Sequence, residues 1–205
     1  MMDRFSSRLT GFVVGVLVLV LSGCASTPPT RFFILSPIAG SERIGARMGE
    51  RCFAIGIGPV KIPEYLNQLE IVTRITQNEI RVDEFAKWAE PLEDNISRAL
   101  AEDLSSLLCI QSIAFFPWKG GTPIDYRIDV HVIQMYGMLG EDAFLDVSWS
   151  IADGADRRRP LLATKRSTYR ESTRGGDYGA FVSAQSRNLA SLSREIAEAI
   201  LQSSK

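Results

Sequence analysis

The stretch IDYRIDVHVIQMY, residues 124–136, decides the architecture that this sequence predicts. Its first part places an apolar or aromatic residue at every second position: Ile124, Tyr126, Ile128, Val130 and Val132. Such alternation puts one row of side chains on each face of a strand, with the apolar row toward a core. The stretch DAFLDVSWSI, residues 142–151, repeats the pattern, and a third strand is expected at about residues 161–171. Three successive strands of this kind predict an antiparallel meander.

Two other segments have helical periodicity. Apolar residues recur three or four positions apart within residues 92–108 and again within residues 178–200, which is typical of amphipathic helices. Pro91 suits the start of the first helix, where no backbone N–H is needed, and Asp177 suits the N-cap of the second. Further strands are expected at residues 31–37 and 52–60, with a hairpin at residues 69–82. We therefore expect a single α/β domain, in which two long amphipathic helices pack on a mixed, largely antiparallel β-sheet.

The N-terminus has the layout of a secretory signal peptide. Arg4 and Arg8 precede an apolar run of 11 residues that ends at Leu21, too short to span a bilayer, which needs about 20 helical residues. The run leads into Leu21-Ser22-Gly23-Cys24, which is similar to the bacterial lipobox, where the chain is cleaved before the cysteine and the cysteine is acylated. The alternative is an ordinary signal peptide with a chance cysteine.

The lipobox interpretation divides the chain into three parts. Residues 1–23 would be a lipoprotein signal peptide, residues 24–30 a lipidated tether rich in small residues and proline, and residues 31–205 the folded domain. Acyl chains at Cys24 would anchor the domain in a membrane, since each buried methylene contributes about 0.8 kcal/mol. Ala25 follows the cysteine instead of the aspartate that commonly retains lipoproteins at the inner membrane. We therefore expect the outer membrane, with the domain facing the periplasm.

Composition and the ionisable residues argue against nucleic-acid binding and catalysis. The chain of 205 residues carries 23 Lys+Arg and 24 Asp+Glu; without residues 1–23 the counts are 21 and 23, a formal charge of −2. A surface with this charge balance lacks the excess of Lys and Arg that nucleic-acid binding requires. His131, the one histidine, alternates with valines on the polar face of its strand. No His/Cys cluster has metal-ligand spacing, so we expect no catalytic site, no metal and no cofactor.

Cys52 and Cys109 remain once Cys24 is assigned to lipidation. In an oxidising periplasm such a pair can form a disulfide. The alternative is two buried thiols that act as small hydrophobic residues.

Two segments are candidates for contact with a partner. Tyr65 and Leu66 lie in the turn PEYLNQ, residues 63–68, and supply the aromatic and aliphatic side chains that anchor interfaces. Arg157, Arg158 and Arg159 form the densest basic run. Most such runs are solvated hairpin tips, and a contact with lipid phosphates or an acidic partner is the minority interpretation.

Three quoted stretches together resemble one family. They are RFFILSP at residues 31–37, IGIGPVKIPEYLNQLEIVTR at residues 55–74 and WAEPLEDNISRALAEDLSSLL at residues 88–108. The second carries Pro63, Tyr65 and Leu66 at the family's positions, and the third carries its Trp-Ala-x-Pro-Leu helix start. The chain thereby resembles PqiC/YmbA-type lipoproteins, auxiliary subunits of ABC-type or MCE (mammalian cell entry) intermembrane transport systems.

The resemblance implies a non-catalytic lipoprotein on the inner face of the outer membrane. Its expected partners are MCE-domain and ABC transport proteins, with phospholipid as cargo and a homo-oligomer as one arrangement. It also implies one mixed sheet covered by helices, in agreement with the periodicity. The competing hypothesis is a stand-alone envelope lipoprotein that binds a small ligand or acts as a scaffold.

Overall fold

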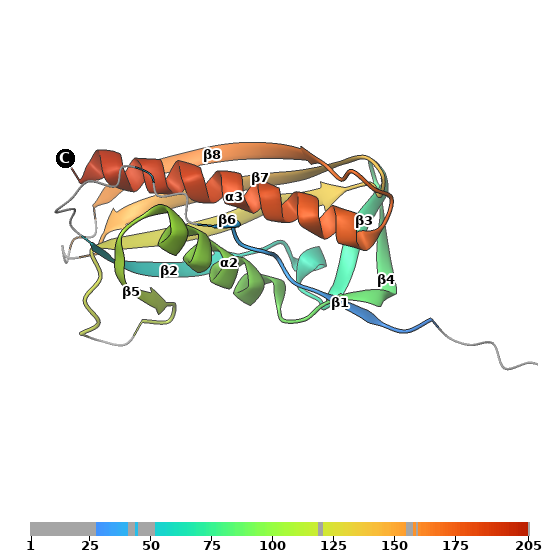
Figure 1. The fold of residues 1–205 in the computed structure, drawn as a ribbon, viewed down its shortest axis with the longest axis horizontal. Helices are drawn as coiled ribbons and strands as arrows, with labels where there is room; N and C mark the ends of the chain where they lie inside the picture. The colour runs from blue at the N-terminus through green and yellow to red at the C-terminus, as the bar shows by residue number, and fades with distance from the viewer. Residues whose placement is uncertain are drawn as a thin grey trace, which may run out of the picture.

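A computed structural model describes residues 28–40, 44, 52–118, 121–154, 158 and 160–204. Figure 1 shows two helices lying together along one side of a long sheet, with a smaller sheet at one end. The strands are β1 (Arg31–Phe33), β2 (Phe53–Lys61), β3 (Glu70–Thr76), β4 (Glu79–Trp88), β5 (Ile110–Phe115), β6 (Tyr126–Gly137), β7 (Asp142–Asp153) and β8 (Leu161–Ser172). The helices are α2 (Leu92–Leu107), α3 (Tyr178–Ser203) and the single 3₁₀ turn η1 (Glu64–Leu66).

The larger sheet has the strand order β5-β2-β6-β7-β8 and the smaller sheet the order β1-β4-β3. In the larger sheet β2 pairs in parallel with β5 and β6, whereas β6, β7 and β8 form an antiparallel meander. The smaller sheet joins the antiparallel hairpin β3–β4 to β1, which runs parallel to β4. The mixed character and the meander predicted from the sequence are confirmed.

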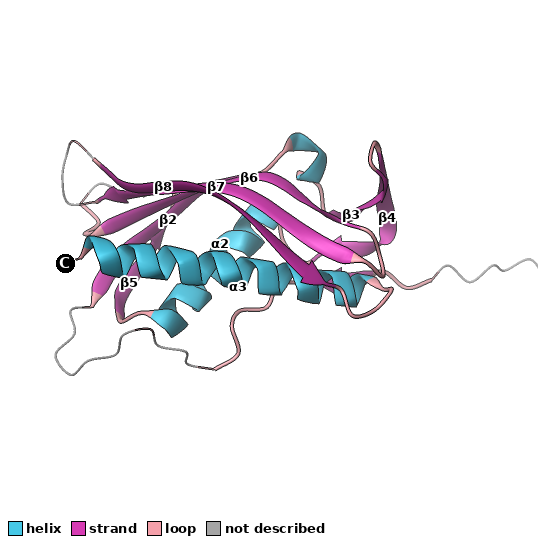
Figure 2. Cartoon of the chain, turned by 90° about the horizontal axis from the view of Figure 1, so that it is seen from above, coloured by secondary structure: helices cyan, strands magenta, loops and turns pink. Residues whose placement is uncertain are grey.

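Both helices cover the same face of the larger sheet (Figure 2). Helix α3 lies against β7 and β8, and α2 lies against β2 and packs on α3. The apolar row of β7 faces them and is almost fully buried: Ala143, Leu145, Val147, Trp149 and Ile151. A two-layer core of this kind explains why the strands alternate while the helices carry one apolar stripe.

The division into two sheets differs from the expectation of one. Strand β3 contacts β6, but its backbone partners lie in β4, so the hairpin closes the end of the larger sheet without joining it. Trp88, which the sequence placed just before the first helix, is the last residue of β4 and is buried. Pro91 is the N-cap of α2, one position before the first turn.

Strand β2 shows why a strand can carry glycines at alternate positions. A Cβ on Gly56 would lie 3.0 Å from the Trp118 ring nitrogen and 3.0 Å from Ile124 Cδ1. Arg127 in turn lies over the Trp118 ring at 4.8 Å. The missing side chain at Gly56 therefore lets the Trp118 ring pack directly against the backbone of this strand.

Candidate functional site: the N-terminal clamp

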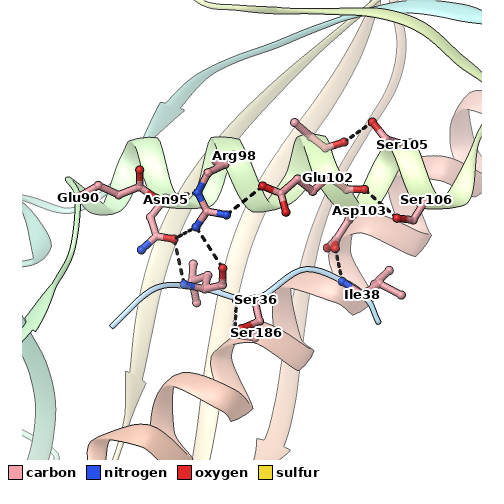
Figure 3. A network of polar contacts seen from close by, with 12 residues as sticks. Ser36, Ile38, Glu90, Asn95, Arg98, Glu102, Asp103, Ser105, Ser106 and Ser186 are labelled. Carbon is pink, nitrogen blue, oxygen red and sulfur yellow. Dashed lines mark hydrogen bonds and ion pairs between the residues drawn. The ribbon is translucent and has the colours of Figure 1, made fainter. Parts of the chain in front are cut away.

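The segment that follows β1 is held between the two helices by polar side chains (Figure 3). Three of its backbone N–H groups donate to side chains of α2 and α3: Leu35 to Asn95 Oδ1 (3.0 Å), Ser36 to Ser186 Oγ (3.0 Å) and Ile38 to Asp103 Oδ1 (2.6 Å). We call Asn95, Asp103 and Ser186 the N-terminal clamp. It supplies the acceptors that a segment without a sheet partner would otherwise lack.

Arg98 ties the clamp to the surface of α2. Its guanidinium donates to Asn95 Oδ1 (2.9 Å) and to the carbonyl oxygen of Leu35 (3.2 Å). It also pairs with Glu90 at 2.9 Å and with Glu102 at 3.1 Å. Because two carboxylates hold Arg98 in place, its contacts to the segment require no further ordering of the side chain.

Asp103 joins three parts of the molecule at one carboxyl group. Its side chain is 1% exposed and accepts hydrogen bonds from Ile38 N and from the Ser193 hydroxyl of α3 (2.7 Å). Burial raises the pKa of Asp103 above its ordinary value, and the two hydrogen bonds oppose that shift only partly. The clamp therefore contains a buried carboxyl group that costs free energy when ionised.

Two surface grooves are lined in part by residues that hold the clamped segment, Arg98 in the first and Ser186 in the second. The first, of about 470 Å³, runs between β2, β5 and the start of α2, and its wall includes Glu93, Asp94, Phe115 and Phe116. The second, of about 400 Å³, runs between residues 36–39 and α3 and includes Arg187. Both grooves have walls of mixed charge, because Arg98 also lines the first and Glu171, paired with Arg187 at 2.8 Å, also lines the second.

The predicted contact turn PEYLNQ is only partly exposed. Tyr65 is 36% exposed and lines a hollow of about 250 Å³, in which Arg74 lies 3.9 Å from the centre of the Tyr136 ring. Leu66 is 4% exposed and belongs to the core. The prediction that Leu66 contacts a partner is wrong for this structure, because the 3₁₀ turn points its side chain inward.

The other predicted site residues are placed as follows. Cys52 and Cys109 form a disulfide with their Cα atoms 4.5 Å apart, one of the two alternatives that the sequence left open. Arg158 is exposed in the connection between β7 and β8, while Arg157, Arg159 and Cys24 lie outside the described residues. His131 is exposed on β6.

Neither a metal-binding group of His, Cys, Asp or Glu nor a membrane-spanning helix is present among the described residues. Within residues 28–40, 44, 52–118, 121–154, 158 and 160–204, no group of three or more His, Cys, Asp or Glu is arranged to hold a metal ion. In the same part of the chain, neither helix has the length and apolar character needed to cross a membrane.

Sequence comparison assigns the chain to a family. The profile of the family described as "ABC-type transport auxiliary lipoprotein component" matches residues 33–197. The chain belongs to this family. The match begins within β1 and ends within α3, so it contains the whole clamp. No curated protein matches the chain in sequence.

Solved structures similar to this family member share its fold. Protein XCC0632 from Xanthomonas campestris, of the DUF330 family, has a TM-score of 0.62 at 15% identity, over 86% of this chain and 94% of that one. An uncharacterised protein has a TM-score of 0.65 at 16% identity, over 84% of this chain and 99% of that one. At these identities the similarity shows the fold alone.

Proposed function

We propose that this family member is a periplasmic lipoprotein anchored in the outer membrane through Cys24, and a non-catalytic auxiliary subunit of an MCE-type intermembrane lipid transport system. The family match over residues 33–197 carries the proposal, since auxiliary lipoproteins of ABC-type transport are what the family comprises. The lipobox-like sequence before Cys24 supports the anchor. Phospholipid is the proposed cargo of the system.

The clamp suits an anchored protein. Strand β1 begins at Arg31, only seven residues after Cys24, and has three residues of sheet pairing. A pull on the tether therefore passes through β1 into residues 34–38. There the clamp distributes it over α2 and α3, the two helices that cover the core. A terminus without such contacts would fray.

Tyr65 and the arginine run are the proposed contacts with the transport partner. Tyr65 keeps an exposed aromatic ring beside a hollow, the environment in which interface anchors are found. Arg157, Arg158 and Arg159 lie between β7 and β8 and suit an acidic partner.

The proposal is tested by isolating the tagged protein from detergent-solubilised membranes and identifying the co-isolated proteins by mass spectrometry. MCE-domain and permease proteins should accompany the wild-type chain. Cys24→Ser should abolish acylation, because oxygen cannot replace the thioether sulfur, and uncleaved precursor should accumulate at the inner membrane. Tyr65→Ala should fold normally and weaken the co-isolation.

Two results would overturn this assignment. Normal maturation and outer-membrane fractionation of Cys24→Ser would remove the lipid anchor. A correctly acylated protein that co-isolates with no transport component, in a strain whose deletion leaves sensitivity to membrane-active compounds unchanged, would favour the stand-alone lipoprotein.

A further inference from the structure

The segment 31–35, which enters the fold from the tether, alternates between core and surface. Leu35 is 1% exposed and Phe33 packs against the core. Phe32 and Ile34, at the positions between, are 64% and 50% exposed. Single exposed apolar residues are common on protein surfaces. Phe32 in the edge strand β1 and Ile34, the first residue after that strand, form a local apolar face that no described part of the chain covers.

The tether limits how far this face can lie from the anchored cysteine. Phe32 follows Cys24 by eight residues, and an extended chain of that length spans at most about 27 Å. Helix α3, with 26 residues, is about 39 Å long. Strand β1 and the smaller sheet lie at one end of the molecule, whereas the start of β8 lies at the other (Figure 1). An acyl anchor at Cys24 therefore keeps the end that bears Phe32 close to the bilayer.

The chemistry around the pair suits the boundary between headgroups and acyl chains. Arg31 lies 5.0 Å from the centre of the Phe33 ring, and Lys87, the cross-strand neighbour of Phe32, pairs with Glu70 at 2.8 Å. Aromatic and aliphatic side chains flanked by Arg and Lys are typical of surfaces that lie in the membrane interface. The two apolar side chains would face the acyl chains while the Arg31 guanidinium stays at the phosphate level; the charge of Lys87 is already balanced by Glu70.

We propose that Phe32 and Ile34 dock into the lipid surface in which the Cys24 anchor is embedded and so fix the orientation of the domain, with the smaller sheet against the membrane. This inference rests on the proposed lipid anchor. The acyl chains keep this end of the domain near the bilayer, but attachment at one point does not fix which face of that end meets the lipid. The apolar pair supplies the direction: the start of β8, with Arg158 just before it, then points away from the bilayer.

The test places a photoreactive benzoylphenylalanine at position 32, 34 or 161 of the full, acylated chain in vesicles of phosphatidylethanolamine and phosphatidylglycerol. Leu161 is the matched control, because it is 64% exposed like Phe32 but begins β8 at the opposite end. Irradiation should give lipid adducts at positions 32 and 34 in about tenfold excess over position 161, because only side chains at the bilayer surface reach acyl chains. Melting curves of the three variants should match that of the wild type, since all three side chains are exposed.

Each other outcome argues against the docking pair. Equal lipid adducts at positions 32 and 161 would mean that the domain has no fixed orientation, and an excess at 161 would mean the opposite one. Protein adducts at position 32 in place of lipid adducts would identify this face as a contact between copies of the chain. Intact mass of the N-terminal peptide separates the two proposals: an acylated Cys24 without lipid adducts at 32 refutes the docking pair alone, whereas an unacylated Cys24 refutes both.

Discussion

Removing the Cys52–Cys109 disulfide should lower the free energy of unfolding by up to about 4 kcal/mol. The two cysteines are 57 residues apart, and the chain-entropy relation for a loop of that length gives about 14 cal/mol/K, or about 4 kcal/mol at 25 °C. The bond joins the starts of two parallel neighbours, since Cys52 precedes β2, Cys109 precedes β5, and Phe53 N donates to Cys109 O at 2.9 Å. The closed loop contains β2, β3, β4 and α2, and without the bond these 57 residues gain conformational entropy in the unfolded chain.

The assay is equilibrium urea unfolding of the mature chain, followed by circular dichroism with and without reductant. With a urea dependence of roughly 2 kcal/mol/M, loss of the bond should lower the midpoint by about 2 M. Cys52→Ala with Cys109→Ala should behave like the reduced wild type and should not respond to reductant. Two free thiols in the unfolded, unreduced protein, or equal midpoints for the oxidised and reduced forms, would refute the reasoning.

The remaining predictions concern the N-terminal clamp. Asn95→Leu should destabilise the fold by about 1–3 kcal/mol, because it leaves the buried Leu35 N–H without its acceptor. Asn95→Asp keeps that acceptor next to Arg98 and should therefore destabilise the fold less. Thermal melts of the two variants compare these effects. The raised pKa of Asp103 means that the native state binds more protons than the unfolded state between the ordinary and the folded-state pKa, so its contribution to stability falls as pH rises through that window. Asp103→Asn should therefore raise the melting temperature at neutral pH and flatten its pH dependence; a variant less stable than wild type at neutral pH would contradict this.

The elements with strong periodicity could be predicted from the sequence. Strand β7 places a buried apolar residue at every second position from Ala143 to Ile151 because one face meets the helices, and α3 carries an apolar stripe for the same reason. Asp177 accepts from Ala180 N at 2.8 Å, which confirms the predicted N-cap. In each case a local requirement determines the residue pattern: the period of the strand, the period of the helix or the N-cap of the helix.

Strand β5 and the clamp could not be predicted, because their residues are specified by distant parts of the chain. The six residues of β5 form an edge strand, IQSIAF, whose half-exposed positions do not alternate. Asn95 and Asp103 look like ordinary polar residues of an amphipathic helix, yet Asn95 is 0% exposed and its backbone partner, Leu35, lies 60 residues earlier. The local signal that could have suggested them is the eight-residue spacing, which places both on one side of α2.

The clamp also explains why polar residues occupy buried positions of α2, where apolar residues would pack at lower cost. Residues 34–38 are the first of the chain after a strand of only three residues, and terminal segments with so little pairing normally fray. An apolar helix face could bury Leu35 and Ile38, but it could not accept hydrogen bonds from their N–H groups, which would then be buried unpaired. Side-chain acceptors at three points fix both the position and the register of the segment. With the proposed anchor at Cys24, the same contacts would also transmit the orientation of the segment to the core.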